Sequence, residues 1–144
     1  MDKIYKKEIN FRKDGFEDLK AYQKAFQLGL DIMEISKSFP KEEKYSLTDQ
    51  VRRSSRSVCA NIAEGYRKRV YPKSFCSKII DADGECSETI VHIKFAKYAE
   101  YISEETLQYF ESGYEEVGRI LNYMFHNPEK FSGNEPSIVS EPFE

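Results

Sequence analysis

The sequence predicts an all-α protein folded as an antiparallel, up-down-up-down four-helix bundle. Apolar side chains recur at alternating steps of three and four residues through most of the 144-residue chain, which is the period of amphipathic helices. Seven glycines and five prolines are too few for an all-β chain with many turns. Hydrophobic residues make up 40%, which is enough for one domain with an ordinary core. The connections between the periodic segments are short, and short connections favour antiparallel neighbours.

The first two helices have clear boundary signals. The first is expected from about residue 16 to Ser38, because Phe39-Pro40 disfavours and then interrupts a helical backbone. The second begins at Ser46, whose hydroxyl we expect to cap the first amides, with Asp49 as its partner in a capping box.

The third and fourth helices complete the bundle. The third starts after Pro72, which suits a first helical turn, and runs to about Tyr101. The fourth opens at Ser103, followed by two glutamates that complement the helix dipole. Its apolar residues form a heptad-like seam, which is typical of helices packed nearly antiparallel: Leu107, Phe110, Tyr114, Val117, Leu121 and Met124.

The third helix has more apolar surface than one core-facing stripe requires. One stripe consists of Phe75, Ile79, Cys86, Ile90 and Ile93. A second, shifted by roughly a third of a turn, consists of Ile80, Gly84, Ser87, Val91, Phe95 and Tyr98. This surplus has two interpretations: the helix contacts another subunit as well as its own core, or it faces the core with a wide surface.

The predicted bundle covers residues 16–126, between an N-terminal extension (1–15) and a flexible acidic C-terminal tail (127–144). Neither end sustains a helical period. The tail has four acidic residues and one lysine, and it contains three of the five prolines. We therefore expect it to be loosely structured.

Catalytic and metal-binding signatures are absent. The chain has no nucleophile elbow, phosphate-binding loop, zinc-protease motif or paired Cys-x-x-Cys. Asp81-Ala82-Asp83-Gly84 resembles part of a calcium loop, but isoleucines occupy the first and last ligand positions of that frame. Glu88 and His92 lie four residues apart, which is one pair rather than a ligand set. We therefore predict no catalytic residue, no metal, no cofactor and no enzymatic activity.

Composition also indicates the compartment. No apolar run approaches the ~18 residues of a membrane helix, and residues 1–8 lack the apolar core of a secretory signal. The three cysteines have unrelated spacings, which is typical of reduced thiols. A cytoplasmic protein that does not enter a membrane is expected.

Positive charge is concentrated in the second helix, although the chain carries a net charge of −3. Between Ser46 and Val70 the net charge is +4. The candidate nucleic-acid-binding residues are Arg52, Arg53, Arg56, Arg67, Lys68 and Arg69. Guanidinium groups bind phosphate bidentately, so this helix could contact a polyanion. The alternative is that these residues pair with acidic groups of the fourth helix or of a neighbouring subunit.

The middle of the second helix, Gln50-Val51-Arg52-Arg53-Ser54-Ser55-Arg56-Ser57-Val58-Cys59-Ala60-Asn61-Ile62-Ala63-Glu64-Gly65, resembles the signature of the proteins encoded in intervening sequences of bacterial 23S rRNA genes. Phe16-Glu17-Asp18-Leu19, Phe39-Pro40 and Ala82-x-Gly84 with Glu88 match the same family. Serine usually follows that glycine in the family, whereas this chain has Glu85. The resemblance covers about residues 16–126.

This resemblance implies a four-helix subunit that assembles into a ring, a homopentamer. A related protein, the accessory variability determinant of diversity-generating retroelements, shares the fold and binds nucleic acid and a reverse transcriptase. Asn61, Glu64 and Gly65 match the family motif. They serve either a bound ligand or, as a polar tie and a close backbone approach, the packing of the bundle.

Together these observations predict a non-enzymatic, oligomeric helical-bundle protein that contacts RNA or DNA through its basic second helix. The rival is a protein-interaction or scaffolding module without direct nucleic-acid binding, including an accessory role to a reverse transcriptase. In that rival the arginines serve only salt bridges between subunits.

Overall fold

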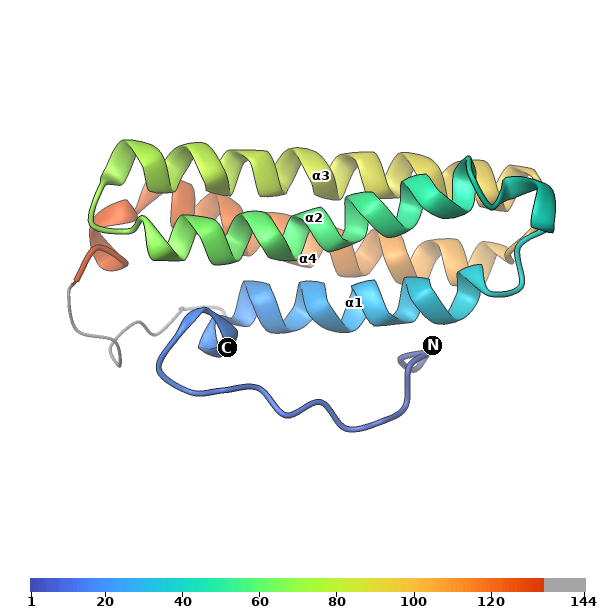
Figure 1. The fold of residues 1–144 in the computed structure, drawn as a ribbon, viewed down its shortest axis with the longest axis horizontal. Helices are drawn as coiled ribbons and strands as arrows, with labels where there is room; N and C mark the ends of the chain where they lie inside the picture. The colour runs from blue at the N-terminus through green and yellow to red at the C-terminus, as the bar shows by residue number, and fades with distance from the viewer. Residues whose placement is uncertain (134–144) are drawn as a thin grey trace.

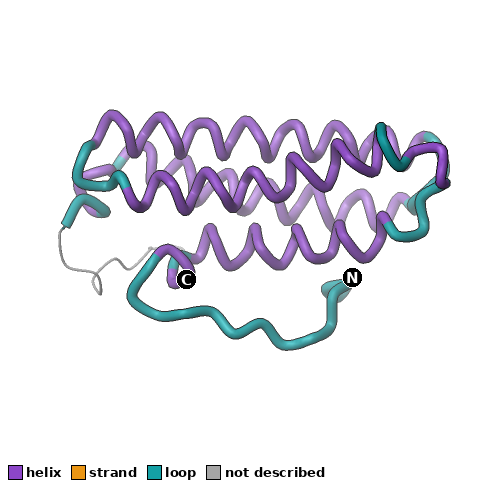
Figure 2. The backbone as a smooth tube through the Cα atoms, viewed as in Figure 1, coloured by secondary structure: helices purple, strands orange, loops and turns teal. Residues whose placement is uncertain are grey.

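The computed structural model describes residues 1–133, and Figures 1 and 2 show four long helices side by side. They are α1 (Lys20–Ser36), α2 (Leu47–Arg67), α3 (Pro72–Tyr98) and α4 (Glu104–His126). Consecutive helices run in opposite directions, and α1 and α3 each contact both α2 and α4 (Figure 1). No strand occurs in residues 1–133. The predicted all-helical, four-helix architecture is confirmed.

The core is formed by one apolar stripe from each helix. All six residues of the predicted α4 seam are buried, and Phe75, Ile79, Cys86 and Ile93 supply the α3 stripe. The second α3 stripe does not reach this core: Ile80, Val91, Phe95 and Tyr98 are 50–76% exposed. The interpretation of α3 as one wide core-facing surface is therefore wrong.

Three short 3-10 helices refine the predicted boundaries: η1 (Phe16–Asp18), η2 (Lys41–Glu43) and η3 (Pro128–Lys130). The first predicted helix is divided, because Leu19 has an extended backbone between η1 and α1. At the other end of the bundle, α3 stops at Tyr98 rather than Tyr101.

The start of α2 is capped differently from the prediction. The Ser46 hydroxyl makes no capping bond to the helix; it donates to Glu43 Oε1 at 2.6 Å. That same oxygen accepts the Leu47 amide at 3.3 Å, and Glu43 Oε2 accepts the Tyr101 hydroxyl at 2.8 Å. Hydrogen bonds from Ser46 and Tyr101 lower the pKa of Glu43. The predicted start of α4 is confirmed: Ser103 is the residue before its first turn, and its Oγ accepts the amide of Thr106.

Two glycines permit close approaches between helices. A Cβ at Gly113 of α4 would lie 2.7 Å from Leu28 Cδ2 of α1, which is shorter than a tolerable contact. A Cβ at Gly65 of α2 would lie 3.2 Å from Lys78 Cβ of α3. Gly29 and Gly84 have open space beside them, so no packing requirement of the subunit explains their presence.

The N-terminal extension is an ordered strap (residues 1–15) along the outer side of α1 (Figure 1). The carboxylate of Asp31, which is completely buried, accepts the amides of Ile4 and Tyr5 at 3.1 and 2.8 Å. It also accepts the Gln27 amide and the Tyr109 hydroxyl. A buried carboxylate is tolerated when several donors satisfy it, and here two of the donors belong to the strap.

Packing also extends past the predicted end of the bundle. Phe131 is fully buried and stacks on Phe75, with ring centroids 5.7 Å apart. The predicted flexible tail therefore begins too early at residue 127. Its residues 134–144 lie outside the described part of the chain. Among the described residues, no helix is both apolar enough and long enough to span a bilayer.

Candidate nucleic-acid interface

One side of α2 faces the core and the opposite side faces solvent. Val51, Val58 and Ile62 are fully buried, because their spacing places them against α1 and α3. The exposed residues that follow the opposite side are Gln50, Arg53, Arg56, Ala60, Glu64 and Arg67. Three of the six predicted basic residues therefore share one solvent-facing stripe.

The first basic cluster is divided by its contacts. Arg52 is half-buried, and its Nε donates to Ser36 Oγ on α1 at 2.8 Å, so it ties two helices together. Arg53 lies 3.9 Å from Asp49, and 70% of its side chain is exposed. Arg56 is exposed and donates only to the backbone carbonyl of Arg52. Arg53 and Arg56 remain available to a ligand, whereas Arg52 has a structural partner.

The second basic cluster lies at the C-terminal end of α2, about 16 Å further along at 1.5 Å per residue. Arg67 lies over the ring of Phe16, with Cζ 5.8 Å from the centroid. Lys68 lies 3.9 Å from Glu64. Arg69 lies over Tyr66 and donates to the carbonyls of Tyr66 and Gly133. The negative end of the helix dipole also attracts these cations.

Two of the three family-motif residues of α2, Glu64 and Gly65, contribute to its packing on α3. Asn61 does not bond to Glu64; its Nδ2 donates to the carbonyl of Ser57 in the same helix. Glu64 pairs with Lys78 of α3 at 3.2 Å, one residue before the close approach at Gly65. These contacts fix the position of α2 along α3, which supports the interpretation that Glu64 and Gly65 serve the packing of the bundle.

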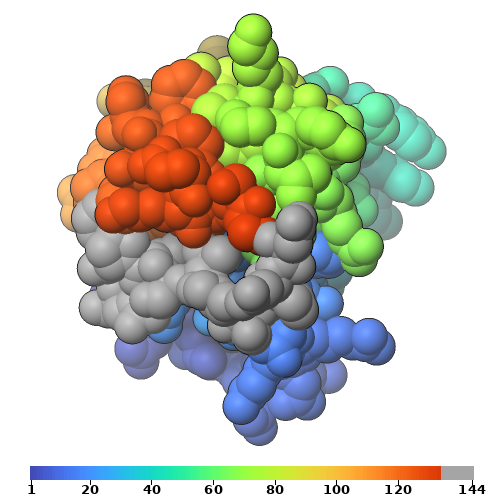
Figure 3. Space-filling model, turned by 90° about the vertical axis from the view of Figure 1, so that its left-hand side faces the viewer, coloured from blue at the N-terminus to red at the C-terminus, as the bar shows by residue number. Residues whose placement is uncertain are grey.

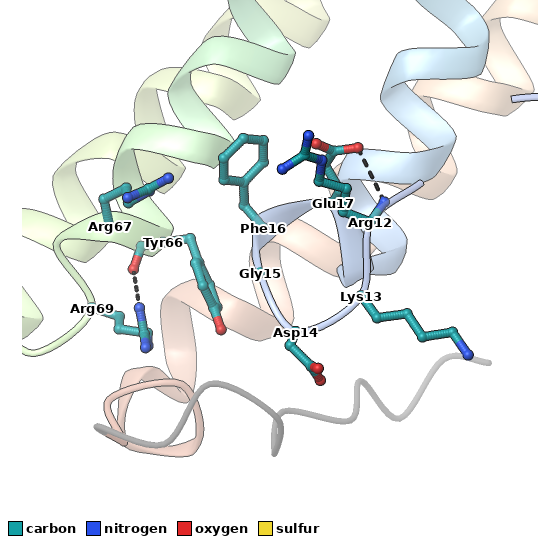
Figure 4. A pocket seen from close by; sticks show the side chains of 9 residues that line it. All are labelled: Arg12, Lys13, Asp14, Gly15, Phe16, Glu17, Tyr66, Arg67 and Arg69. Carbon is teal, nitrogen blue, oxygen red and sulfur yellow. Dashed lines mark hydrogen bonds between the residues drawn. The ribbon is translucent and has the colours of Figure 1, made fainter. Parts of the chain in front are cut away.

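Sequence reasoning missed two further basic residues. Arg12 and Lys13, in the strap, line a pocket that Arg67 and Arg69 also line (Figure 4). More than fifty residues separate the two pairs along the chain. In the sequence, the adjacent basic residues Arg12 and Lys13 could have indicated a binding site. Their position near the end of α2, however, follows only from the path of the strap.

Groups that commonly carry catalysis are either buried or isolated. Burial raises the pKa of the Cys59 thiol to about 12 and that of Cys86 further, so both are protonated at neutral pH. His92 Nε2 lies 3.5 Å from Glu88. Within residues 1–133, no three histidine, cysteine, aspartate or glutamate side chains are grouped as a metal would require.

The fold and this surface define a class: a small helical bundle with a basic, outward-facing second helix. The model of the 23S rRNA-intervening sequence protein family matches residues 17–123, and the chain belongs to that family. Its helices match the crystal structure of a protein of unknown function from the S23 ribosomal protein family of Bacteroides thetaiotaomicron VPI-5482. The TM-score is 0.67 at 23% identity, covering 74% of this chain and 95% of the other. No curated protein sequence matches this chain.

Proposed function

We propose that this protein is a non-enzymatic, self-associating member of its family that contacts RNA or DNA through the exposed basic residues of α2. The observation that carries the proposal is the solvent-facing stripe of α2, in which Arg53 and Arg56 engage none of the neighbouring helices. Arg67 extends the same stripe to the end of the helix. The positive charge along this stripe would bind the phosphates of a nucleic-acid backbone, while Arg52 holds α2 against α1 through its hydrogen bond to Ser36.

Self-association is supported by the apolar stripe on the outside of α3. Phe95 and Tyr98 are 66% and 76% exposed, and Ile80 and Val91 are about half exposed. Gly84 and Ser87 lie between them on the same side, at steps of three and four that suit packing against another helix. Soluble monomers seldom leave such a continuous apolar surface in water.

A closed ring is the assembly that the family resemblance favours, with five copies. In a ring each copy presents two different surfaces, one of which would be the α3 stripe. The basic side of α2 faces away from the core of its own subunit, so a ring can present several copies of it to one polyanion. Multiple weak phosphate contacts then act together.

The test of self-association is the double variant Val91→Glu with Phe95→Glu. Both side chains are exposed, so the subunit keeps its fold while two carboxylates prevent apolar contact. Light scattering at micromolar concentration should give an oligomer for the wild type and a monomer for the variant. The control is Gln108→Glu with Ser112→Glu on exposed α4 positions, which should remain oligomeric. A monomeric wild type would overturn this part of the proposal.

The test of nucleic-acid contact is Arg53→Glu with Arg56→Glu, measured by fluorescence anisotropy on a structured RNA hairpin and a DNA duplex. Wild-type affinity should fall steeply with salt, and the variant should lose binding, because charge reversal removes the phosphate contacts. The matched control, Lys20→Glu with Arg119→Glu, makes the same charge change at exposed positions outside α2. Absence of binding at low salt would favour the scaffolding alternative, including a role beside a reverse transcriptase.

A further inference from the structure

The end of the bundle where α2 joins α3 contains a concave site of about 510 Å³. Figure 3 views this end, with the α2–α3 connection in green and the strap in blue. The volume falls within the usual range of pockets for small molecules. The side chains that matter here are Arg12, Lys13, Asp14, Phe16, Arg67 and Arg69.

The pocket is positively charged because separate segments bring their cations to one place. The strap supplies Arg12, α2 ends at Arg67, and Arg69 follows it; Lys13 also lines the pocket, but its side chain extends away from these three arginines (Figure 4). Two carboxylates oppose these four cations, those of Asp14 and Glu17. The partial negative charge of the α2 terminus offsets only part of the surplus, so the field in the pocket favours an anion.

The guanidinium groups retain unused donors. Arg67 has no ion pair within the described residues, and its contact there is the face of Phe16. Arg69 uses Nε and one Nη1 bond on backbone carbonyls, which fixes its plane and leaves its other terminal nitrogen free to donate. Both arginines line the same pocket, and a prepositioned arginine together with an unpaired one is suited to a phosphate group.

Aromatic surface lies next to these donors. Figure 4 shows Phe16 between Arg67 and the strap, and Tyr66 beside Arg69. Phe16 is half-buried, so part of its ring is accessible from the pocket. A nucleobase can stack on the accessible part of the Phe16 ring without sequence preference, and arginine adds to the interaction, whereas Tyr66 is only 5% exposed.

We propose that this pocket binds a nucleoside phosphate, with the phosphate held by Arg67 and Arg69 and the base lying against Phe16. The ligand is either a free nucleotide or the phosphorylated end of a single strand. Only the second source rests on the proposed nucleic-acid function. The proposal differs from contact along α2, because it needs the strap and a single phosphate rather than a line of phosphates.

The experiment is a calorimetric titration with AMP, with adenosine and with inorganic phosphate, followed by NMR to locate the site. Wild-type protein should bind AMP more tightly than adenosine or phosphate alone. Arg67→Gln should weaken AMP binding about tenfold, the usual consequence of losing one charged hydrogen bond. Arg119→Gln is the matched control, since it removes the same charge from an exposed position of α4 outside the pocket, and should leave AMP affinity unchanged.

A second variant should strengthen binding. Asp14 has a left-handed backbone with φ of 65°, which asparagine also tolerates, so Asp14→Asn removes one opposing charge without disturbing the turn. AMP affinity should rise several-fold. No AMP binding by the wild type, equal affinity for AMP and adenosine, or equal loss in Arg119→Gln and Arg67→Gln would each overturn the proposal.

Oligonucleotides separate the two sources of the nucleotide. A short single strand bearing a terminal phosphate should bind more tightly than the same strand with hydroxyl ends, and Arg67→Gln should remove that difference. AMP binding without binding of any single strand, RNA hairpin or DNA duplex would leave the pocket as a free-nucleotide site and refute the α2 contact. RNA hairpin binding without AMP binding would support the α2 contact and refute the proposal that the pocket binds a nucleoside phosphate.

Discussion

The sides of α1 and α3 that face away from the core both carry apolar side chains, but within the described residues only those of α1 are covered by another segment of the subunit. On α1, Tyr22 and Phe26 are covered by the strap, whose Phe11 packs edge-on against both rings. On α3, Phe95 and Tyr98 are 66% and 76% exposed, and the contact to the Tyr98 ring comes from the neighbouring Lys97, whose Nζ lies 4.2 Å from the ring centroid. Figure 1 shows the strap beneath α1 and nothing comparable beside α3.

This difference shows what a surplus apolar surface means in a small bundle. The fifteen residues of the strap bring their own amides to Asp31, so covering α1 also satisfies a buried carboxylate. The α3 stripe contains no buried polar anchor, and its exposed residues are apolar or small. The covered surface of α1 contributes to the stability of one subunit. The exposed stripe of α3 is suited to packing against a second copy of the same chain.

The largest expected effect is on the strap anchor. Asp31→Ala should lower the free energy of unfolding by about 3 kcal/mol, because the amides of Ile4 and Tyr5 and the Tyr109 hydroxyl lose their acceptor. Urea denaturation measures the change, and trypsin should cleave the strap lysines faster. Glu34→Ala on the same helix should change stability by less than about 0.5 kcal/mol. Equal effects at both sites would mean that the strap contributes little.

A smaller effect distinguishes the two aromatic surfaces directly. Phe11→Ala should cost about 2 kcal/mol, since the ring packs on α1. Phe95→Ala should change stability by less than about 0.5 kcal/mol at protein concentrations too low for association, because 66% of the residue is exposed. Thermal unfolding at high dilution provides the measurement. A large loss for Phe95→Ala under those conditions would contradict the contrast.

Alanine substitutions at a buried glycine of α4 and at an exposed glycine of the α3 stripe should change stability in opposite directions. Gly113→Ala should destabilise the subunit by about 1 kcal/mol, because the new methyl group would meet Leu28 of α1. Gly84→Ala on the α3 stripe should stabilise it by about 0.5–1 kcal/mol through helix propensity, since its surroundings are open. Denaturation of both variants in the dilute regime tests this. The same sign for both would refute the difference in packing.

The smallest effect is at alkaline pH. Burial, together with the hydrogen bond to Asp31, raises the pKa of Tyr109 well above its ordinary value of 10.0. The folded state therefore holds this proton more tightly than the unfolded chain. Its stabilising contribution is complete below pH 10 and is lost progressively as the pH rises through the folded-state pKa. Tyr109→Phe should make the decline in unfolding free energy above pH 10 shallower, and an unchanged slope would contradict this assignment.

The candidate interface was only partly predictable. The basic character of α2 and the exposure of Arg53 and Arg56 follow from its helical period. Arg52, one residue away from Arg53, could not be separated from them by period alone, because its bond to Ser36 depends on the angle at which α1 crosses α2. The pocket was not predictable, because Arg12 and Lys13 reach it only through the path of the strap.

By itself, the sequence determined the four helices, the buried seam of α4 and the presence of two apolar stripes on α3. These features are local, since a repeating apolar spacing allows a helix to bury one side. Only the tertiary structure decided which α3 stripe faces the core, that Glu43 rather than Ser46 caps α2, and that residues 1–15 close over Asp31. The first and last of these outcomes depend on contacts between segments distant in sequence, and Glu43, although close to the start of α2, also accepts a hydrogen bond from the distant Tyr101, so no local period encodes them.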